Sequence, residues 1–347
     1  MIQGSYPGGP RLLADIGGTN ARFALEIAPG CVVAQQTLAC AAFPRFEDAA
    51  RAYLDGAQTS ASHAVVAIAN PVSGDAVKMT NHDWAFSIAA ARRELRLDTL
   101  LAVNDFTALA MALPALGPGD LFKVGGGQAV PGGVLGLVGA GTGLGVSGLV
   151  PAGARWIPLQ SEGGHVAFSP SDEREVAVLR YLWRRFEHVS AERMVSGPGI
   201  ALIREALASV RGLDIDAALP TAAIVERALD GSDPLCREAL DCFSGMLGTV
   251  AANLAVTLGA TGGVYIGGGV APRLGDYFAA SPFRARFENK GRFSAFAARI
   301  PTVLITAPYP ALLGAAAILN EHLAAKTAQH SAPPSAAPTP EPHHARH

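Results

Sequence analysis

Apolar and polar residues alternate close to the start of the chain. Between residues 20 and 27 every second residue is apolar, and most of the residues between them are polar. A period of two predicts β-strands, and a pair of glycines predicts a turn. Residues 12–27, which contain Gly17 and Gly18, are therefore expected to form two strands around a glycine turn.

Short apolar runs along the rest of the chain predict further buried strands. These runs are residues 63–68, 100–103, 134–138, 263–266 and 302–305. Helical patterns lie between several of them, and no period of 20 to 50 residues repeats. Strands mixed with helices, with glycine turns after the strands, indicate an α/β protein with ligand loops at strand ends.

Two segments predict long helices. Apolar residues recur at helical spacing after an apparent start at Ser169, Pro170 and Asp172, so a helix is expected over 172–186. The apolar positions are Val176, Leu179, Trp183 and Phe186. Residues 242–272 lack charge, but glycines interrupt them at Gly262 and Gly263. This favours a buried helix followed by a strand over a membrane span.

Composition limits the class of protein. The chain has 347 residues, 50% of them apolar, and a net charge of −2, which suits two globular domains and gives no sustained charge for nucleic acid or anionic lipid. Four scattered cysteines and the absence of an export signal pattern at the N-terminus predict a reduced, cytoplasmic protein. The Pro/Ala/Ser-rich residues 326–347 predict a disordered tail.

Two glycine segments could bind phosphate through backbone N–H groups. In the first, Asp15 precedes Gly17, Gly18, Thr19 and Asn20; Asp15 could hold Mg²⁺ directly or through water. An ordinary hairpin turn capped by Asp15 explains this segment equally well. The second contains Gly139, Gly141, Thr142 and Gly143.

The second segment also satisfies GxGxxG, but a dinucleotide fingerprint requires a helix to follow it. Prolines and strand-like residues follow instead, and GxxxxGK[ST] does not occur in the chain. The Rossmann and P-loop interpretations therefore fail, and a second phosphate-binding hairpin is expected.

Four polar side chains could act on a substrate with hydroxyl groups. Asp105, after the strand at 100–103, could accept a hydroxyl proton, although a lone Asp there could simply cap the next helix. Glu162 and His165 flank two glycines, which argue against a helical metal site and favour hydrogen bonds to sugar hydroxyls. Glu192 could be another acceptor or a solvated charge.

Nine motifs in order resemble the bacterial glucokinase family, within the actin-like ATPase superfamily of sugar kinases. The resemblance extends from about residue 12 to about residue 323. The motifs are ADIGGTNARFAL, MTNHDWAFS, VNDFTALAMALP, GAGTGLGVS, EGGHVAFSP, HVSAERMVSGPG, GGVYIGGGVAPR, KGRFS and PALLGAA.

This resemblance implies a two-domain, actin-like (ribonuclease H-like) ATPase fold with an interdomain cleft. The small domain would span residues 1–115 and 306–325, and the large domain residues 116–305. Asp105 would be the general base, with ATP, Mg²⁺ and glucose as ligands. Sugar hydroxyls would be bound by Asn104, Asp105, Glu162, His165 and Glu192, and the adenine pocket would be lined by Gly267, Gly268 and Gly269. Asn81 and Trp84 match a motif near the sugar cleft, and a homodimer is plausible by family.

Two other classes of protein fit the sequence less well. A sugar-responsive repressor would need a DNA-binding helix-turn-helix, for which about ten residues before the first strand leave no room. An actin-like filament or chaperone ATPase would have no need of the Glu162 and His165 pair. The resemblance implies a glucokinase that phosphorylates the 6-hydroxyl of glucose, with the choice among hexoses and phosphoryl donors set by pocket shape.

Overall fold

The computed structural model describes residues 5–6, 8–80, 82–214 and 219–331. Its first sheet has the order β3-β2-β1-β4-β7. The strands are β1 (Arg11–Ile16), β2 (Asn20–Ala28), β3 (Cys31–Ala39), β4 (His63–Ile68) and β7 (Thr99–Asn104). β1 pairs antiparallel with β2 and parallel with β4, and β4 pairs parallel with β7. The predicted glycine hairpin is confirmed as β1 and β2.

The second sheet repeats this plan, with the order β11-β10-β9-β12-β13-β8. Its strands are β8 (Leu121–Val124), β9 (Leu135–Ala140), β10 (Leu144–Ala152), β11 (Arg155–Pro158), β12 (Gly263–Gly267) and β13 (Thr302–Ile305). An antiparallel hairpin is again followed by two parallel strands, and β8 is an added antiparallel edge. The two halves of the molecule therefore each carry a glycine hairpin at the same place in the sheet.

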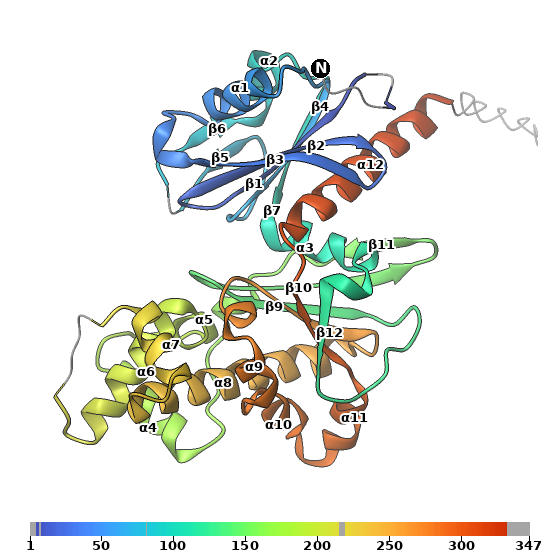
Figure 1. Ribbon diagram of the computed structural model, residues 1–347. Helices are drawn as coiled ribbons and strands as arrows, with labels where there is room; N and C mark the ends of the chain where they lie inside the picture. Colours follow the sequence, from blue (N-terminus) through green and yellow to red (C-terminus); the bar gives the residue numbers. More distant parts are fainter. Residues whose placement is uncertain (1–4, 7, 81, 215–218, 332–347) are drawn as a thin grey trace, which may run out of the picture.

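Helices α3 (Asp105–Ala112) and α12 (Pro310–Ser331) lie between the two sheets, as Figure 1 shows. Leu13 of β1 packs with Leu312 and Leu319 of α12, whereas Leu109 of α3 packs with Leu137 of the second sheet. The C-terminal helix thus covers the first sheet although nearly 200 residues of the second lobe separate them in the chain. This arrangement brings the last described segment beside the first strand.

The outer faces of both sheets are covered by other helices. Leu12, Ala14 and Ile16 of β1 face the cluster that contains Phe46 and Tyr53 of α1, because alternate residues of a strand point to opposite faces. The small elements of this lobe are α1 (Phe46–Gly56), β5 (Ala76–Lys78), β6 (Ala85–Ser87) and α2 (Ile88–Glu94). The other lobe carries α4 (Glu173–Leu182), α5 (Ala191–Met194), α6 (Gly197–Val210), α7 (Thr221–Leu229), α8 (Pro234–Leu258), α9 (Asp276–Ala280), α10 (Phe283–Glu288) and α11 (Ser294–Arg299).

The uncharged segment at 242–272 forms most of helix α8 and then strand β12, as predicted. By length and composition α8 could cross a membrane, but 78% of its most apolar window is buried inside the protein. Leu240, Phe243 and Leu247 belong to the large core that covers the second sheet. α8 is therefore a core helix of this lobe.

Two helix boundaries differ from the predictions. Asp172, rather than Ser169, is the N-cap of α4, because its side chain accepts the Glu175 N–H at 2.8 Å. The helix ends at Leu182, so Trp183 lies beyond it and is exposed. α12 continues through residues 326–331, where the tail was expected to be disordered already; residues 332–347 lie outside the described part of the chain.

Candidate active site

A cleft of about 640 Å³ opens where strands of both sheets end. It collects residues that follow β1, β4, β7, β9 and β12, since the carboxyl ends of parallel strands lie at one edge of a sheet. Most of the residues predicted from sequence line it: Gly18, Thr19, Asn104, Asp105, Gly139, Gly141, Thr142, Gly143, Glu162, His165, Glu192 and Gly268. The other five predicted residues do not line the cleft, although they lie close in sequence to residues that do. They are Asp15, Gly17, Asn20, Gly267 and Gly269.

Asp105 is the first residue of α3, but it is not the cap of that helix. Asn104 is the N-cap, and its Oδ1 accepts the N–H groups of Phe106 and Thr107 at 2.9 and 3.0 Å. The Asn104 amide also donates to Asp105 Oδ1 at 3.1 Å. The neighbouring asparagine thus orients the Asp105 carboxylate, and the helix-cap explanation of Asp105 is wrong.

The surroundings of Asp105 make its carboxyl group a weaker acid than an ordinary aspartic acid side chain. Burial is the main cause, the negative charge of Asp15 adds to it, and together they raise the pKa of Asp105 to about 7. The Phe106 N–H, which donates to Oδ1 at 2.9 Å, opposes part of this rise. A carboxyl group with a pKa near neutrality can both accept and return a proton under physiological conditions.

Asp15 lies at the end of β1, next to the first hairpin. Burial raises the pKa of Asp15, and the guanidinium group of Arg22, 3.1 Å away on β2, opposes this rise. The turn itself closes through the Gly17 N–H, which donates to Asn20 O at 3.0 Å. A second hydrogen bond restrains the turn: the backbone N–H of Cys40 donates to Thr19 O at 2.9 Å.

The second hairpin joins β9 to β10, so the predicted absence of a following helix is confirmed. Gly139 lies opposite Gly267 in the parallel pairing of β9 with β12. A methyl group on Gly139 would overlap the backbone of Gly267 and Gly268, and one on Gly268 would overlap Ala140. These glycines are required for close backbone packing, whereas Gly269 faces open space. The adenine pocket assigned to them stays a prediction.

Glu162 and His165 face the cleft from opposite ends of a short 3₁₀ turn, Gly163–His165. Their Oε2 and Nε2 atoms are 3.9 Å apart, and both side chains are more than half exposed. Gly163 and Gly164 permit this turn, because a methyl group on either would overlap Val146 or Leu144. The pair therefore presents an acceptor and an imidazole to the solvent of the cleft.

Several residues of the cleft were not predicted from sequence. Asn70 follows β4 and binds Thr80 twice: its Nδ2 donates to Thr80 Oγ1 at 2.8 Å, and the Thr80 N–H donates to its Oδ1 at 2.9 Å. The position of Asn70 after a buried strand, like that of Asn104, was the signal that could have found it. Of the motif residues near this wall, Asn81 lies outside the described residues, and Trp84 is buried in the core of its lobe.

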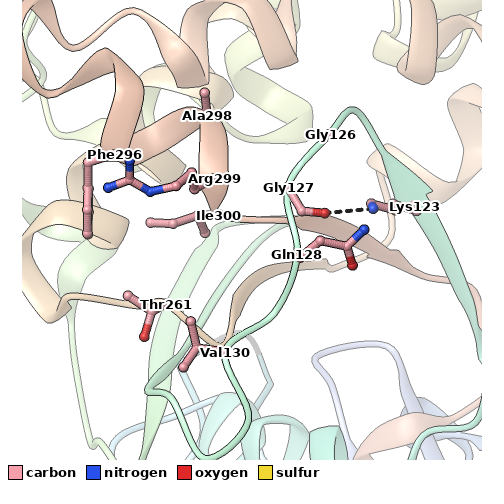
Figure 2. A pocket seen from close by; sticks show the side chains of 10 residues that line it. All are labelled: Lys123, Gly126, Gly127, Gln128, Val130, Thr261, Phe296, Ala298, Arg299 and Ile300. Atoms are coloured by element: carbon pink, nitrogen blue, oxygen red, sulfur yellow. Dashed lines mark hydrogen bonds between the residues drawn. The ribbon is translucent and has the colours of Figure 1, made fainter.

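A second cavity, of about 600 Å³, lies at the opposite ends of β12 and β13 (Figure 2). Thr261 precedes β12, Arg299 and Ile300 precede β13, and Lys123 of β8 donates to Gly127 O at 2.7 Å. Its lining contains two cationic side chains and no carboxylate. It therefore has no group that could serve as a proton acceptor like Asp105.

Comparisons with known proteins identify one family over most of the chain. The family model described as Glucokinase matches residues 12–322. A "Bifunctional protein glk" of Burkholderia pseudomallei is 59% identical over 92% of the chain, and the chain spans about half the length of this relative and of the similar Burkholderia proteins. A "Glucokinase" of Chromobacterium violaceum is 54% identical, with 95% of the chain and 94% of the relative covered. The crystal structure of a glucokinase from an Antarctic psychrotroph superposes with a TM-score of 0.82 at 35% identity, covering 90% of this chain and 99% of that one.

Two sheets of matching order, each with a glycine hairpin at a shared cleft, define the two-domain actin-like ATPase fold of the sugar kinases. Within this class, two findings identify the family: its model matches residues 12–322, and the relatives are 54% to 59% identical over more than nine-tenths of the chain. The chain belongs to the glucokinase family.

Proposed function

We propose that the protein is a glucokinase that transfers the γ-phosphoryl group of ATP to the 6-hydroxyl of glucose. The observation that carries this proposal is Asp105, a carboxylate of pKa about 7 that lines a cleft together with both glycine hairpins. Membership of the glucokinase family supports it, as does a related glucokinase crystallised with glucose and AMPPNP.

In the proposed reaction Asp105 accepts the proton of the 6-hydroxyl as the hydroxyl oxygen attacks the γ-phosphorus. The bond from the γ-phosphorus to the oxygen that leaves with ADP breaks, and a new phosphorus–oxygen bond to the sugar forms. Asn104 keeps Asp105 Oδ1 in place, which leaves Oδ2 for the substrate. Such positioning, with a base of matched pKa, accounts for much of the catalysis expected in phosphoryl transfer.

The sugar would bind between Asp105 and the Glu162–His165 turn, with Asn104 and Glu192 as further partners. Glu162 and His165 are exposed and close enough to contact adjacent hydroxyl groups. Phosphate oxygens would be held by the backbone N–H groups of the turns around Gly18 and Gly141–Gly143, and adenine by the segment around Gly269.

Magnesium fits the oxygen ligands beside this cleft. Asp15, which lies next to the first hairpin, is close enough for its charge to raise the pKa of Asp105, and oxygen ligands are those that Mg²⁺ prefers. Asp15 would hold the ion directly or through water, while Arg22 keeps this carboxylate in place. When bound with ATP, the ion would neutralise phosphate charge.

Three further expectations from the sequence stay predictions. They are the cytoplasmic location, the homodimer and the domain boundaries at residues 115 and 306.

The experiment is an assay of ADP release over a panel of glucose, mannose and fructose, with ATP, ADP or polyphosphate as donor. We expect the highest kcat/KM with glucose and ATP, and glucose 6-phosphate as the product. Turnover of no hexose with any of these donors would contradict the proposed function.

A further inference from the structure

Glu192 contacts the second hairpin while it lines the cleft. It lies in the first turn of α5, and its Oε2 accepts the backbone N–H of Leu144 at 2.9 Å. Leu144 is the first residue of β10 and follows the turn Gly141–Gly143 directly. One side chain expected to bind the sugar therefore also holds the loop expected to bind the phosphates.

The contact depends on Gly143. A methyl group on this residue would overlap Glu192 Oε2 and lie 3.1 Å from its carboxyl carbon. The absence of a side chain at position 143 thus lets the carboxylate lie directly against the turn. Glycine is required there for this close approach rather than for its backbone angle, because Gly143 is not among the residues with positive φ.

Backbone groups provide the other support of the turn. The Gly141 N–H donates to Gly143 O at 2.8 Å, and the Gly197 N–H donates to Gly141 O at 2.8 Å. Among the side chains of residues 5–6, 8–80, 82–214 and 219–331, only Glu192 hydrogen-bonds to residues 139–145. Its second oxygen, Oε1, has no hydrogen-bond partner within the same described residues, and Glu192 is one of the residues that line the cleft.

We propose that Glu192 is a positioning residue that couples the two substrates of the cleft. Oε2 fixes the phosphate hairpin, and Oε1 accepts a hydrogen bond from a sugar hydroxyl. A bound sugar therefore restrains the carboxylate that restrains Leu144, and nucleotide and sugar each strengthen the binding of the other. By linkage the two effects are equal. This inference rests on the proposed function, because it takes the sugar and nucleotide as the ligands.

The test measures binding of Mg-AMPPNP by calorimetry, with and without saturating glucose. Glu192→Ala removes the acceptor of the Leu144 N–H, so we expect AMPPNP to bind the sugar-free protein about 5- to 10-fold more weakly. Glu192→Gln keeps an acceptor oxygen and should bind AMPPNP nearly as the unmodified protein does. Glu162→Ala is the matched control: it removes a sugar partner that does not touch the hairpin, and should weaken glucose binding alone.

Glucose should tighten AMPPNP binding to the unmodified protein and to Glu162→Ala at saturating sugar, but not to Glu192→Ala. A folded Glu192→Ala protein that binds AMPPNP normally and still responds to glucose would overturn the proposal. These binding experiments do not depend on turnover. An enzyme that binds both ligands but phosphorylates no hexose would refute the proposed function and leave the coupling testable.

Gly143→Ala provides a second test, and it applies on its own if Glu192→Ala does not fold: a folded Gly143→Ala protein that binds both ligands normally would overturn the proposal. The added methyl group would push the carboxylate away from the hairpin, and we expect weaker binding of both AMPPNP and glucose. When Gly143→Ala is combined with Glu192→Gln, the added methyl group still overlaps the side chain at position 192. When it is combined with Glu192→Ala, this overlap disappears. Gly143→Ala should therefore weaken binding less in the Glu192→Ala protein than in the unmodified protein. An equal effect in the presence and absence of the Glu192 side chain would overturn the proposal.

Discussion

At the scale of single residues, two carboxylates of the cleft are held by neighbouring groups: the Asn104 amide donates to Asp105 Oδ1, and Glu192 Oε2 accepts the Leu144 N–H. Asp105 was recognisable because a carboxylate follows a buried strand. Its orientation by Asn104 and the contact of Glu192 with Leu144 were not, since each depends on a rotamer or on packing between segments distant in the chain. Asn70 was missed because a lone asparagine after a strand also suits an ordinary turn.

The raised pKa of Asp105 predicts the pH dependence of turnover. The base acts only when ionised, so kcat/KM for glucose, which reports the pKa values of the free enzyme, should fall as the pH decreases through about 7, by up to tenfold per pH unit. The check is kcat/KM for glucose between about pH 5 and pH 8, together with the melting temperature at each pH. A kcat/KM that stays constant over this range in a folded protein would show that no group with this pKa limits the reaction.

At the scale of elements, strands were predicted better than helix ends. The period of two and the apolar runs gave the buried strands β1, β2, β4, β7, β9, β12 and β13 to within about two residues, because burial on a sheet imposes that pattern. The edge strands β3, β8 and β11 were not predicted, since they are more exposed and lack such apolar runs. Helix ends depend on caps, and both Ser169 and Asp172 are suitable cap residues. The exposed Trp183 shows that an apolar residue at helical spacing can still lie beyond the end of the helix.

The contact of α3 with α12 predicts a position where a single methyl group is destabilising. At Gly314 of α12, a side chain would overlap the carbonyl oxygen of Ala108 in α3. Gly314→Ala should therefore lower the free energy of unfolding by about 1 to 3 kcal/mol. Gly56→Ala at the end of α1 is the control, because nothing lies within 4 Å of its added methyl group. Thermal melts compare the two; a Gly314→Ala protein as stable as the control would contradict this account of the packing.

At the scale of the whole molecule, the repeated strand order explains why the cleft lies where it does. Each sheet places its glycine hairpin at the carboxyl end of its first parallel strand, and α12 and α3 pack against the facing sides of the first and second sheet, respectively. Local patterns predicted an α/β protein, but the two-domain arrangement with a cleft came from the family resemblance, and the matching strand order of the two sheets is a finding of the structure. The pairing of a C-terminal helix with the first sheet is a long-range contact that no local pattern encodes.

The side chains expected to bind the sugar are exposed in the cleft, which predicts that the two lobes close around glucose when it binds. Glu162 and His165 are more than half exposed, and excluding water from phosphoryl transfer requires the two lobes to approach each other. We expect glucose to reduce the radius of gyration measured by small-angle X-ray scattering, and Glu162→Ala to need more glucose for the same change. An unchanged radius at saturating glucose would mean that the lobes do not close around the sugar.

The central claim is that Asp105 accepts the proton of the sugar hydroxyl, and Asp105→Asn tests it most directly. Asn keeps the size and much of the hydrogen bonding of Asp but cannot take up the proton. At saturating glucose and ATP, kcat should fall by about 10² to 10⁴-fold, while directly measured glucose affinity changes far less. The melting curve should show a folded protein. A folded Asp105→Asn protein with near-normal kcat would remove Asp105 from the reaction and contradict the account.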